Sequence, residues 1–386
     1  MSFQHYASLY ISIILCLFVS TTDAYQFEKS INICFDPTPA QEATLKYTLS
    51  KLNIKFRKAD CENYFQKLKS IKKINFLAQG EELDLTPLSE LTQLKGLSVQ
   101  GAKSLSVSPI STLVNLEKLA LQATKILDIH TISNLHDLNT INIQESNVSD
   151  ISFLENLNDI EQLYLSDNKI NDLTPIKNKQ RLKHLIIRGN PLSNINALST
   201  LSNLKSLRMT TVGIKDITPL SGATNLEELY IDYNNITDIS PLSKLVYLRK
   251  LDMNNNHIKS LEPLRPLKHL QHLTFRNNHV EDISPLSDLP NLGYLVISDN
   301  NIRYLSPLLA LDGLYNVTAY GNPMVDCKGD VVKLARNAIQ CENGWISPDN
   351  VPTSKDSPKD RKSGLELDTD KKQNSLLSRF LSLFMF

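Results

Sequence analysis

Several features that mark particular protein classes are scarce or missing in this chain. Glycine accounts for only 12 of 386 residues, below the roughly 7% of average usage, so glycine-rich phosphate loops are not expected. Lys and Arg number 41, as do Asp and Glu, and this lack of a basic excess argues against a nucleic-acid binder. The sequence has no GxSxG, P-loop, HExxH or CxxC pattern. We therefore expect no catalytic residue, no cofactor and no metal site.

Long hydrophobic runs are also missing. One short apolar run covers residues 11–19, fewer than the roughly 20 residues that span a bilayer. Polar residues follow it, and the small residues Thr22 and Ala24 suit signal peptidase. The sequence predicts a signal peptide over residues 1–24, cleaved before Tyr25, with an uncleaved anchor as the alternative. The mature chain is then exported and is secreted, held at the cell surface or periplasmic.

Cysteine is rare but its placement is informative. Without the signal peptide four cysteines remain, one close pair before the central region and one after it. Four cysteines allow three connectivities, and an exported chain can keep disulfides. We predict the bridges Cys34–Cys61 and Cys327–Cys341. Use of one cysteine as a nucleophile is the alternative.

The central region is an internal repeat. An apolar residue opens the pattern L-x-L-x-x-N, and it recurs after 23 residues once and after 22 residues thereafter. The residue two positions later is also apolar, and this alternation indicates a short strand. These opening residues, the anchors of successive coils, are Ile74, Leu97, Leu119, Ile141, Leu163, Leu185, Leu207, Leu229, Leu251, Leu273, Leu295 and Val317.

Asparagine recurs five residues after the anchor. Its amide carries both donors and an acceptor, so it can bond the main chain of its own coil and of the next one where the chain leaves the strand. Five coils have Gln79, Ala102, Thr124, Ser146 or Val212 instead, mostly near the N-terminal end, where we expect a less regular ladder. The asparagines are Asn168, Asn190, Asn234, Asn256, Asn278, Asn300 and Asn322.

A proline follows in the second half of most coils. Proline suits the start of a short helical turn because its φ is fixed and it lacks an N–H. The return path is therefore expected to be a 3₁₀-like turn, and stacked coils bury one continuous core. These prolines are Pro87, Pro109, Pro175, Pro219, Pro241, Pro263, Pro285 and Pro307.

Residues 71–322 resemble the leucine-rich repeats of bacterial internalins. The resemblance is carried by segments such as LEELYIDYNNITDISPLSKLVYLRKLDMNNNHI, and they are also similar to the 22-residue class of a eukaryotic phosphatase-regulating scaffold. It implies an α/β leucine-rich repeat solenoid, with parallel strands on the concave face and 3₁₀-like turns on the convex face. Most such proteins are non-enzymatic binders, and internalins hold host surface proteins. This chain departs from internalins in lacking an LPxTG motif and in the paired cysteines at its ends.

The flanks of the repeats are expected to cap the core. Thr38 and Gln41 form a capping box around Pro39, which predicts a helix near 39–52, with a second near 61–70, in an N-terminal cap over residues 25–70. A helix over 330–339 belongs to a C-terminal cap over 323–346. Residues 347–375 form a solvated, disordered linker. The apolar segment 376–386 is expected to contact a membrane surface or a partner, or to fold back or fray.

Side chains one before, one after and three after each anchor face outward on the concave side. Tyr and Arg are favoured at interface hot spots, whereas the alternative is a solvated sheet whose charges pair between coils. We expect Arg188, Arg208, Tyr230, Asp232 and Asp252 to form one patch. The predicted partner-binding residues are Tyr164, His184, Arg188, Arg208, Tyr230, Asp232, Tyr233, Asp252, Arg276, Tyr294 and Tyr320.

The sequence thus predicts an exported, monomeric, non-enzymatic protein that recognises a protein partner through its concave face. Two alternatives stay open. One is a secreted effector that acts on or inhibits a host enzyme, and the other is an envelope-associated structural scaffold.

Overall fold

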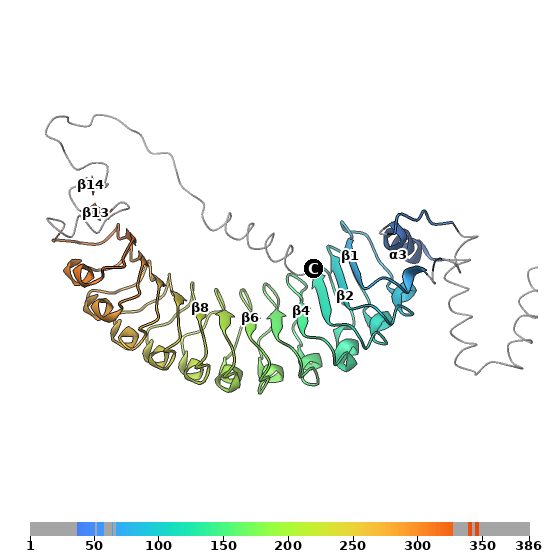
Figure 1. The fold of residues 1–386 in the computed structure, drawn as a ribbon, viewed down its shortest axis with the longest axis horizontal. Helices are drawn as coiled ribbons and strands as arrows, with labels where there is room; N and C mark the ends of the chain where they lie inside the picture. Colours follow the sequence, from blue (N-terminus) through green and yellow to red (C-terminus); the bar gives the residue numbers. More distant parts are fainter. Residues whose placement is uncertain are drawn as a thin grey trace, which may run out of the picture. The chain divides into compact units, whose positions relative to one another are not determined.

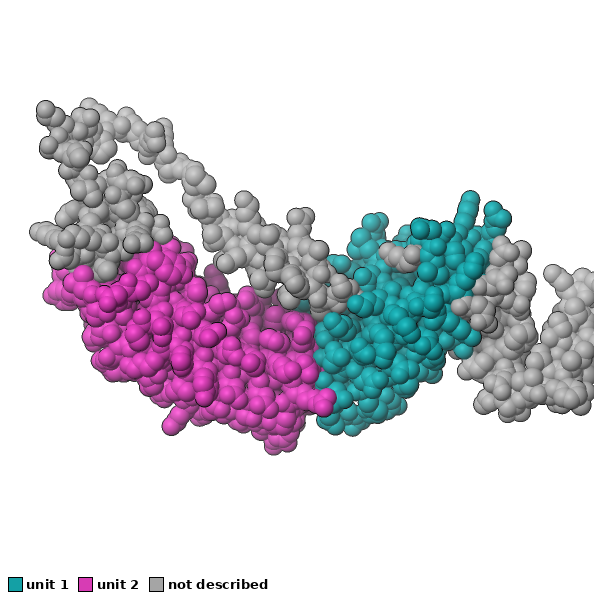
Figure 2. Space-filling view, in the orientation of Figure 1, with its two compact units in different colours: residues 1–159 teal, residues 160–386 magenta. Residues whose placement is uncertain are grey.

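The computed structural model describes residues 37–50, 52–57, 64, 67–326, 339–341 and 344–346. The chain divides into two compact units, residues 1–159 and 160–386, coloured separately in Figure 2. The predicted signal peptide, the paired cysteine side chains, the linker and the apolar C-terminal segment lie outside the described residues. None of the helices in the described ranges is long and apolar enough to cross a membrane.

Unit 1 contains a parallel sheet whose strands follow chain order, as labelled in Figure 1. The anchors pair across it, Ile74 with Leu97, Leu97 with Leu119 and Leu119 with Ile141. Each strand returns through a 3₁₀ helix. The elements are β1 (Lys73–Leu77), η2 (Thr86–Leu88), β2 (Gly96–Gln100), η3 (Ser108–Ile110), β3 (Lys118–Gln122), η4 (Ile129–Asn134), β4 (Thr140–Asn142) and η5 (Ser152–Leu154).

A helix, α3 (Pro39–Ser50), precedes these strands. It begins with the predicted capping box, because the main-chain N–H of Thr38 donates to Gln41 Oε1 at 3.0 Å and that of Gln41 donates to Thr38 Oγ1 at 3.2 Å. Gln41 Nε2 also donates to Asp84 Oδ2 at 2.9 Å, and the rings of Tyr47 and Phe76 lie 4.7 Å apart. The helix therefore packs against the first coil.

The two other predicted cap helices fall mostly on residues that the structure does not describe. Within 61–70, the described residues Tyr64, Lys67 and Leu68 are helical. Of the helix expected over 330–339 only Ile339 is described, and it begins a strand. That strand, β13 (Ile339–Cys341), pairs antiparallel with β14 (Gly344–Ile346).

Unit 2 repeats the same plan over eight strands, in a 22-residue register from Leu163 to Val317. Within this unit the strands lie on the concave side and the 3₁₀ helices on the opposite side (Figure 1). Its elements are β5 (Gln162–Tyr164), η6 (Thr174–Ile176), β6 (His184–Ile186), η7 (Asn196–Thr200), β7 (Ser206–Arg208), η8 (Thr218–Gly222), β8 (Glu228–Tyr230), η9 (Ser240–Lys244), β9 (Lys250–Asp252), η10 (Glu262–Leu264), β10 (His272–Thr274), η11 (Ser284–Asp288), β11 (Tyr294–Val296), η12 (Ser306–Ala310) and β12 (Asn316–Thr318).

The asparagines form the expected ladder, with one difference in direction. Asn256 Nδ2 donates to the carbonyls of Met253 and Asn254 in its own coil, and to that of Ile231 at 3.0 Å in the coil before. Its Oδ1 accepts the N–H of Ile236, also in the preceding coil, at 3.1 Å. The asparagines thus bond to the preceding coil, whereas the sequence argument expected the next one. Asparagine is long enough to reach back because parallel coils lie about 4.8 Å apart.

Shorter side chains replace the amide in unit 1. Thr124 Oγ1 donates to the carbonyl of Gln122 and accepts the N–H of Ala102, while Ser146 Oγ donates to the carbonyls of Leu121 and Gln144. A hydroxyl makes fewer bonds than an amide, so the expected irregularity near the N-terminal end is confirmed.

The residue before each ladder position in unit 2 adopts a left-handed backbone conformation. At Gly189 φ is +67°, and a Cβ there would also lie 2.3 Å from Asp167 Oδ1. Non-glycine residues carry this conformation elsewhere, at a cost of roughly 1–2 kcal/mol each. They include Thr211 (φ 57°) and Tyr233 (φ 53°). The main-chain N–H of each donates to the following coil, Thr211 to Asp232 O and Tyr233 to Asn254 O, which explains why the conformation is repeated.

Candidate functional site

The strand face of unit 2 presents three parallel columns of side chains between the buried anchors. They stand one before, one after and three after each anchor, as the strand period requires. The first column comprises Gln162, His184, Ser206, Glu228, Lys250, His272, Tyr294 and Asn316. The second comprises Tyr164, Ile186, Arg208, Tyr230, Asp252, Thr274, Val296 and Thr318, and the third comprises Ser166, Arg188, Thr210, Asp232, Asn254, Arg276, Ser298 and Tyr320.

Arg208 and Tyr230 form the centre of this face. They are register partners on β7 and β8, and the guanidinium carbon of Arg208 lies 4.0 Å from the centroid of the Tyr230 ring. Cation–π stacking of this kind holds the guanidinium plane in place. Both side chains are half-buried, and burial raises the pKa of the Tyr230 hydroxyl. The pair offers an apolar ring and a positioned cation side by side.

Two carboxyl groups meet directly beyond Tyr230. Asp232 is only 7% exposed, and burial, with the hydrogen bond and charge of Asp252, raises the pKa of Asp232 to about 9. The raised pKa favours the protonated form of Asp232. Asp252 also accepts hydrogen bonds from Thr274 Oγ1 and Asn254 Nδ2. Asp232 therefore adds little charge to the face, and the half-buried Asp252 stands beside it.

Other charges on the face pair between coils, as the alternative interpretation expects. Lys250 Nζ lies 2.8 Å from Glu228 Oε1, and this bond raises the pKa of Lys250. Arg276 Nε lies 2.8 Å from Asp299 Oδ2, with its guanidinium 5.2 Å from the centroid of the Tyr320 ring. Lys250 is half-buried and Arg276 is exposed, so both side chains belong to the accessible surface of the sheet.

The last coils carry a cluster of aromatic side chains, and not all buried polar atoms near it have a hydrogen-bond partner. The rings of His272 and Tyr294 are 5.7 Å apart, and the hydroxyl of Tyr315 lies 3.5 Å from His272 Nε2. Within the described part of the chain, His272 Nδ1 and Asn316 Oδ1 are buried without a hydrogen-bond partner. Burial lowers the pKa of His272, so its ring is neutral at pH 7.

The structure brings together four of the five residues of the expected patch. Arg208 stacks on Tyr230, Tyr230 is the register partner of Asp252, and Asp252 bonds Asp232. Arg188 lies in the third column one coil before Arg208.

Two predicted partner-binding residues are not exposed. Tyr164 is 8% exposed and its hydroxyl donates to Gln162 Oε1, while Asp232 is enclosed as described above. Burial also lowers the pKa of the half-buried His184. Tyr233 is 49% exposed, but it stands at the turn after β8. The accessible candidates therefore run from His184 and Arg188 through Arg208 and Tyr230 to the later coils, without Tyr164 and Asp232.

Sequence reasoning missed the two flanks of unit 2. One flank holds a groove of about 840 Å³ beside the amino ends of the strands. Its lining residues are Glu161, Gln180, Arg181, Lys183, Asn203, Lys205, Asn225, Glu227, Tyr247, Arg249 and His269. Nearly all stand four or two positions before an anchor, so the same period could have revealed them.

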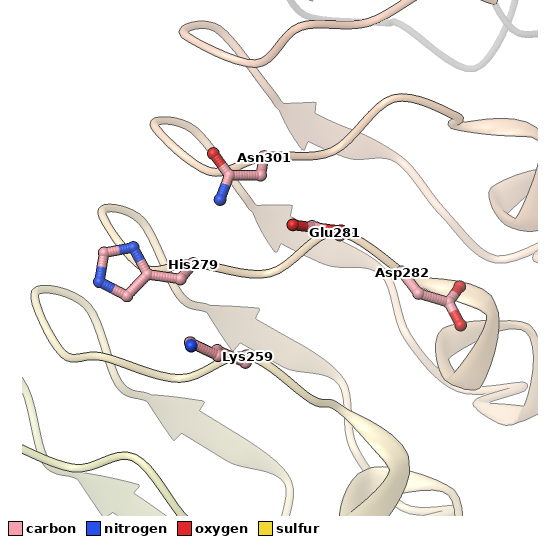
Figure 3. Close-up of a pocket in the computed structure, with 5 residues that line it drawn as sticks. All are labelled: Lys259, His279, Glu281, Asp282 and Asn301. Atoms are coloured by element: carbon pink, nitrogen blue, oxygen red, sulfur yellow. The ribbon is translucent and has the colours of Figure 1, made fainter.

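The opposite flank holds a second groove, of about 690 Å³ (Figure 3). Asp282 lies apart from the other side chains in this view, because it accepts bonds from the N–H and hydroxyl of Ser284 at the start of η11. The rings of His257 and His279 stack 5.6 Å apart. The lining residues are Lys259, His279, Glu281, Asp282 and Asn301. Among the described residues no group of three His, Cys, Asp or Glu side chains could hold a metal ion.

Known proteins share this architecture. Residues 224–266 and 268–310 match the family model for leucine-rich repeats. Internalin InlF of Listeria monocytogenes is 29% identical, with 81% of this chain and 90% of that chain covered and a TM-score of 0.71. A leucine-rich repeat protein of Leptospira interrogans is 18% identical over 72% of this chain and 85% of that chain, with a TM-score of 0.53.

A plant structure is similar in fold alone. The leucine-rich repeat ectodomain of the receptor kinase GASSHO1/SCHENGEN3 of Arabidopsis thaliana was solved in complex with CASPARIAN STRIP INTEGRITY FACTOR 2. It is 23% identical over 67% of this chain and 34% of that chain, with a TM-score of 0.54. No curated protein matches the sequence.

Proposed function

We propose that this chain, a leucine-rich repeat protein of the internalin type, is an exported, non-enzymatic protein that binds another protein through the strand face of unit 2. The observation that carries the proposal is the pair formed by Arg208 and Tyr230, stacked at 4.0 Å in the middle of that face. Arg and Tyr are the residue types that dominate binding energy at protein interfaces. The plant ectodomain named above, which has the same fold, was solved in complex with CASPARIAN STRIP INTEGRITY FACTOR 2.

The charges around the pair favour a protein ligand over a small molecule. Glu228 and Lys250 pair within the face, and the raised pKa of Asp232 favours its uncharged form, so few unpaired carboxylates surround the guanidinium of Arg208. A guanidinium can bind a carboxylate through two parallel hydrogen bonds. The stacked ring adds apolar area next to it. A partner surface with a carboxylate beside an apolar side chain would fit both.

Binding is tested with the exported chain as bait. Partners recovered from the extracellular medium or from exposed cells are identified by mass spectrometry, and the affinity of each purified partner is measured by calorimetry. Arg208→Ala should weaken binding by about 2 kcal/mol, roughly thirtyfold. Arg303→Ala, which removes an equal charge at an exposed position on a flank, serves as the control and should leave the affinity unchanged.

Two results would count against the proposal. Equal affinities for the two variants would place the interface elsewhere on the molecule. Failure to recover any partner, together with a hydrolase activity of the purified chain, would favour an enzyme.

Export and the disulfides belong to the same proposal. The secreted form should begin at Tyr25, which amino-terminal sequencing checks. Peptide mapping without reductant should join Cys34 to Cys61 and Cys327 to Cys341. An intact residue 1 or four free thiols in exported material would contradict these assignments.

A further inference from the structure

A second asparagine ladder runs along the flank of unit 2 that lies beside the amino ends of the strands. It uses the position four residues before the anchor, which is asparagine in three coils of this unit. Asn203 Nδ2 donates to the carbonyl of Gln180 at 3.0 Å, Asn225 Nδ2 to that of Ser202 at 2.9 Å, and Asn291 Nδ2 to that of Lys268 at 2.7 Å. Each bond joins two successive coils. Asparagine at this position therefore serves the main chain of the preceding coil, whereas Arg181 and Gly313 stand there in two further coils.

Two successive coils break this ladder with aromatic side chains. Tyr247 and His269 occupy the position, and their rings stack with centroids 6.3 Å apart at an interplanar angle of 12°. Tyr247 is 54% exposed, and His269 is also exposed. A large apolar ring gains little stability in such a place, because most of its surface stays in water. The two stacked rings line one end of the groove.

The floor of the same groove is cationic. Residues two before the anchors line it, and two of its lysines already have partners: Lys183 bonds Glu161 at 2.8 Å and Lys205 bonds Glu227 at 2.9 Å. Arg249 is exposed and forms no ion pair with any residue that the structure describes. Lys183, Lys205 and Arg249 thus stand against the two carboxylates of Glu161 and Glu227, and of these three cations only Arg249 has no ion pair with either one. Its guanidinium belongs to the same coil as Tyr247.

We propose that this groove is a second binding surface, which takes an extended acidic segment of a protein partner. A carboxylate of the segment binds Arg249, and a neighbouring apolar side chain packs on Tyr247. The groove crosses six coils, or about 24 Å at about 4.8 Å per coil, which matches about seven residues of extended chain. This surface is separate from the strand face, so it adds a site to the proposed function and does not depend on it.

The chemistry of the groove favours a peptide of this kind. Guanidinium groups bind carboxylates in two parallel hydrogen bonds, and these charge-assisted bonds are among the stronger ones. Salt weakens attraction between exposed charges, because the Debye length falls to about 8 Å at physiological ionic strength. Packing on Tyr247 is not screened in this way. Binding should therefore weaken with salt without being abolished.

The test uses the purified full chain and a fluorescein-labelled heptapeptide in which Glu alternates with Leu. Fluorescence anisotropy measures its affinity, and a matched peptide with Gln in place of Glu reports the contribution of charge. Arg249→Gln should weaken binding of the acidic peptide by at least about tenfold. Tyr247→Asn should weaken it by about fivefold while restoring the residue that the neighbouring coils carry, so this variant should fold normally.

Lys259→Gln is the charge-matched control, because Lys259 lines the groove on the opposite flank. It should change the affinity by less than about twofold, as exposed charges at a distance are screened. Equal binding of the Glu and Gln peptides, equal losses for Arg249→Gln and Lys259→Gln, or no binding of the acidic peptide would each overturn the proposal. A heparin-derived oligosaccharide that binds in an Arg249-dependent manner when the peptide does not would also overturn it, in favour of a glycan ligand.

Discussion

The guanidinium carbon of Arg208 lies over the ring of Tyr230, which stands on the next strand of the sheet, 4.0 Å from the ring centroid. The stack orients the guanidinium while its N–H edges stay available, because no ion pair of Arg208 is found among the described residues. Pre-ordering of this kind lowers the entropy that a partner must remove on binding.

The first prediction separates stacking from charge. Arg208→Lys keeps the charge but loses the planar group, so we expect it to lose most of the partner affinity that Arg208→Ala loses. Both variants should change the free energy of unfolding by no more than about 1 kcal/mol, the usual size of an exposed cation–π pair. Urea denaturation and calorimetry with the recovered partner check this. If Arg208→Lys binds the partner as tightly as the wild type does, the positive charge alone accounts for the contribution of this position to binding.

The second prediction concerns the ladder. Asn256→Val leaves the N–H of Ile236 without its partner, so we expect a loss of about 2–3 kcal/mol in the free energy of unfolding. The reverse change, Val212→Asn, is the matched variant. Val212 occupies the ladder position in the coil directly before that of Asn234. It should be neutral or should stabilise by about 1 kcal/mol. Equal losses for the two variants in urea titrations would show that the amide is not the cause.

The third prediction follows from backbone conformation. Thr211 has φ of 57°, which is unfavourable for a β-branched residue. Thr211→Gly should therefore raise the free energy of unfolding by roughly 0.5–1 kcal/mol, after the added entropy of the unfolded chain is counted. The neighbouring change Thr210→Gly should lower it, since Thr210 has no positive φ that glycine could relieve. Thermal denaturation of both variants distinguishes these directions.

The fourth prediction concerns pH. The pKa of Asp232 is about 9 in the folded protein, against about 3.9 in an unfolded chain. The folded state therefore keeps a proton that the unfolded chain releases above pH 4, and the stability this provides is lost as the pH rises toward 9. Asp232→Asn mimics the protonated side chain and removes this slope. The unfolding free energies of wild type and variant should diverge from pH 5 to pH 9, whereas parallel curves would place an ionised carboxylate at this site.

The repeat period explains how much of the fold the sequence predicts. An apolar anchor every 22 residues determines strand register, and Leu229 pairs with Leu207 and Leu251 as expected. The proline present in most coils likewise predicts a 3₁₀ helix, as at η9. These features depend on residues within one coil or its direct neighbour.

The burial of individual side chains on the strand face could not be predicted in the same way. Alternation gives the face on which Tyr164 and Asp232 lie, but their burial depends on how side chains of adjacent coils close over them. The protonation of Asp232 depends in turn on the position of Asp252. The flank groove was missed because its asparagines serve the main chain, and only the substitutions at Tyr247 and His269 make it distinctive.

The backward reach of the asparagine ladder gives unit 2 a direction of assembly. Asn256 finds its distant partners at Ile231 and Ile236, both of which leave the ribosome before it does. Each new coil can complete its polar contacts as soon as it is synthesised, on a surface that the growing chain has already built. A nascent chain stopped at the end of any coil would then have every ladder amide satisfied, whereas one stripped of its first coils would not. Vectorial synthesis from the N-terminus therefore suits this architecture.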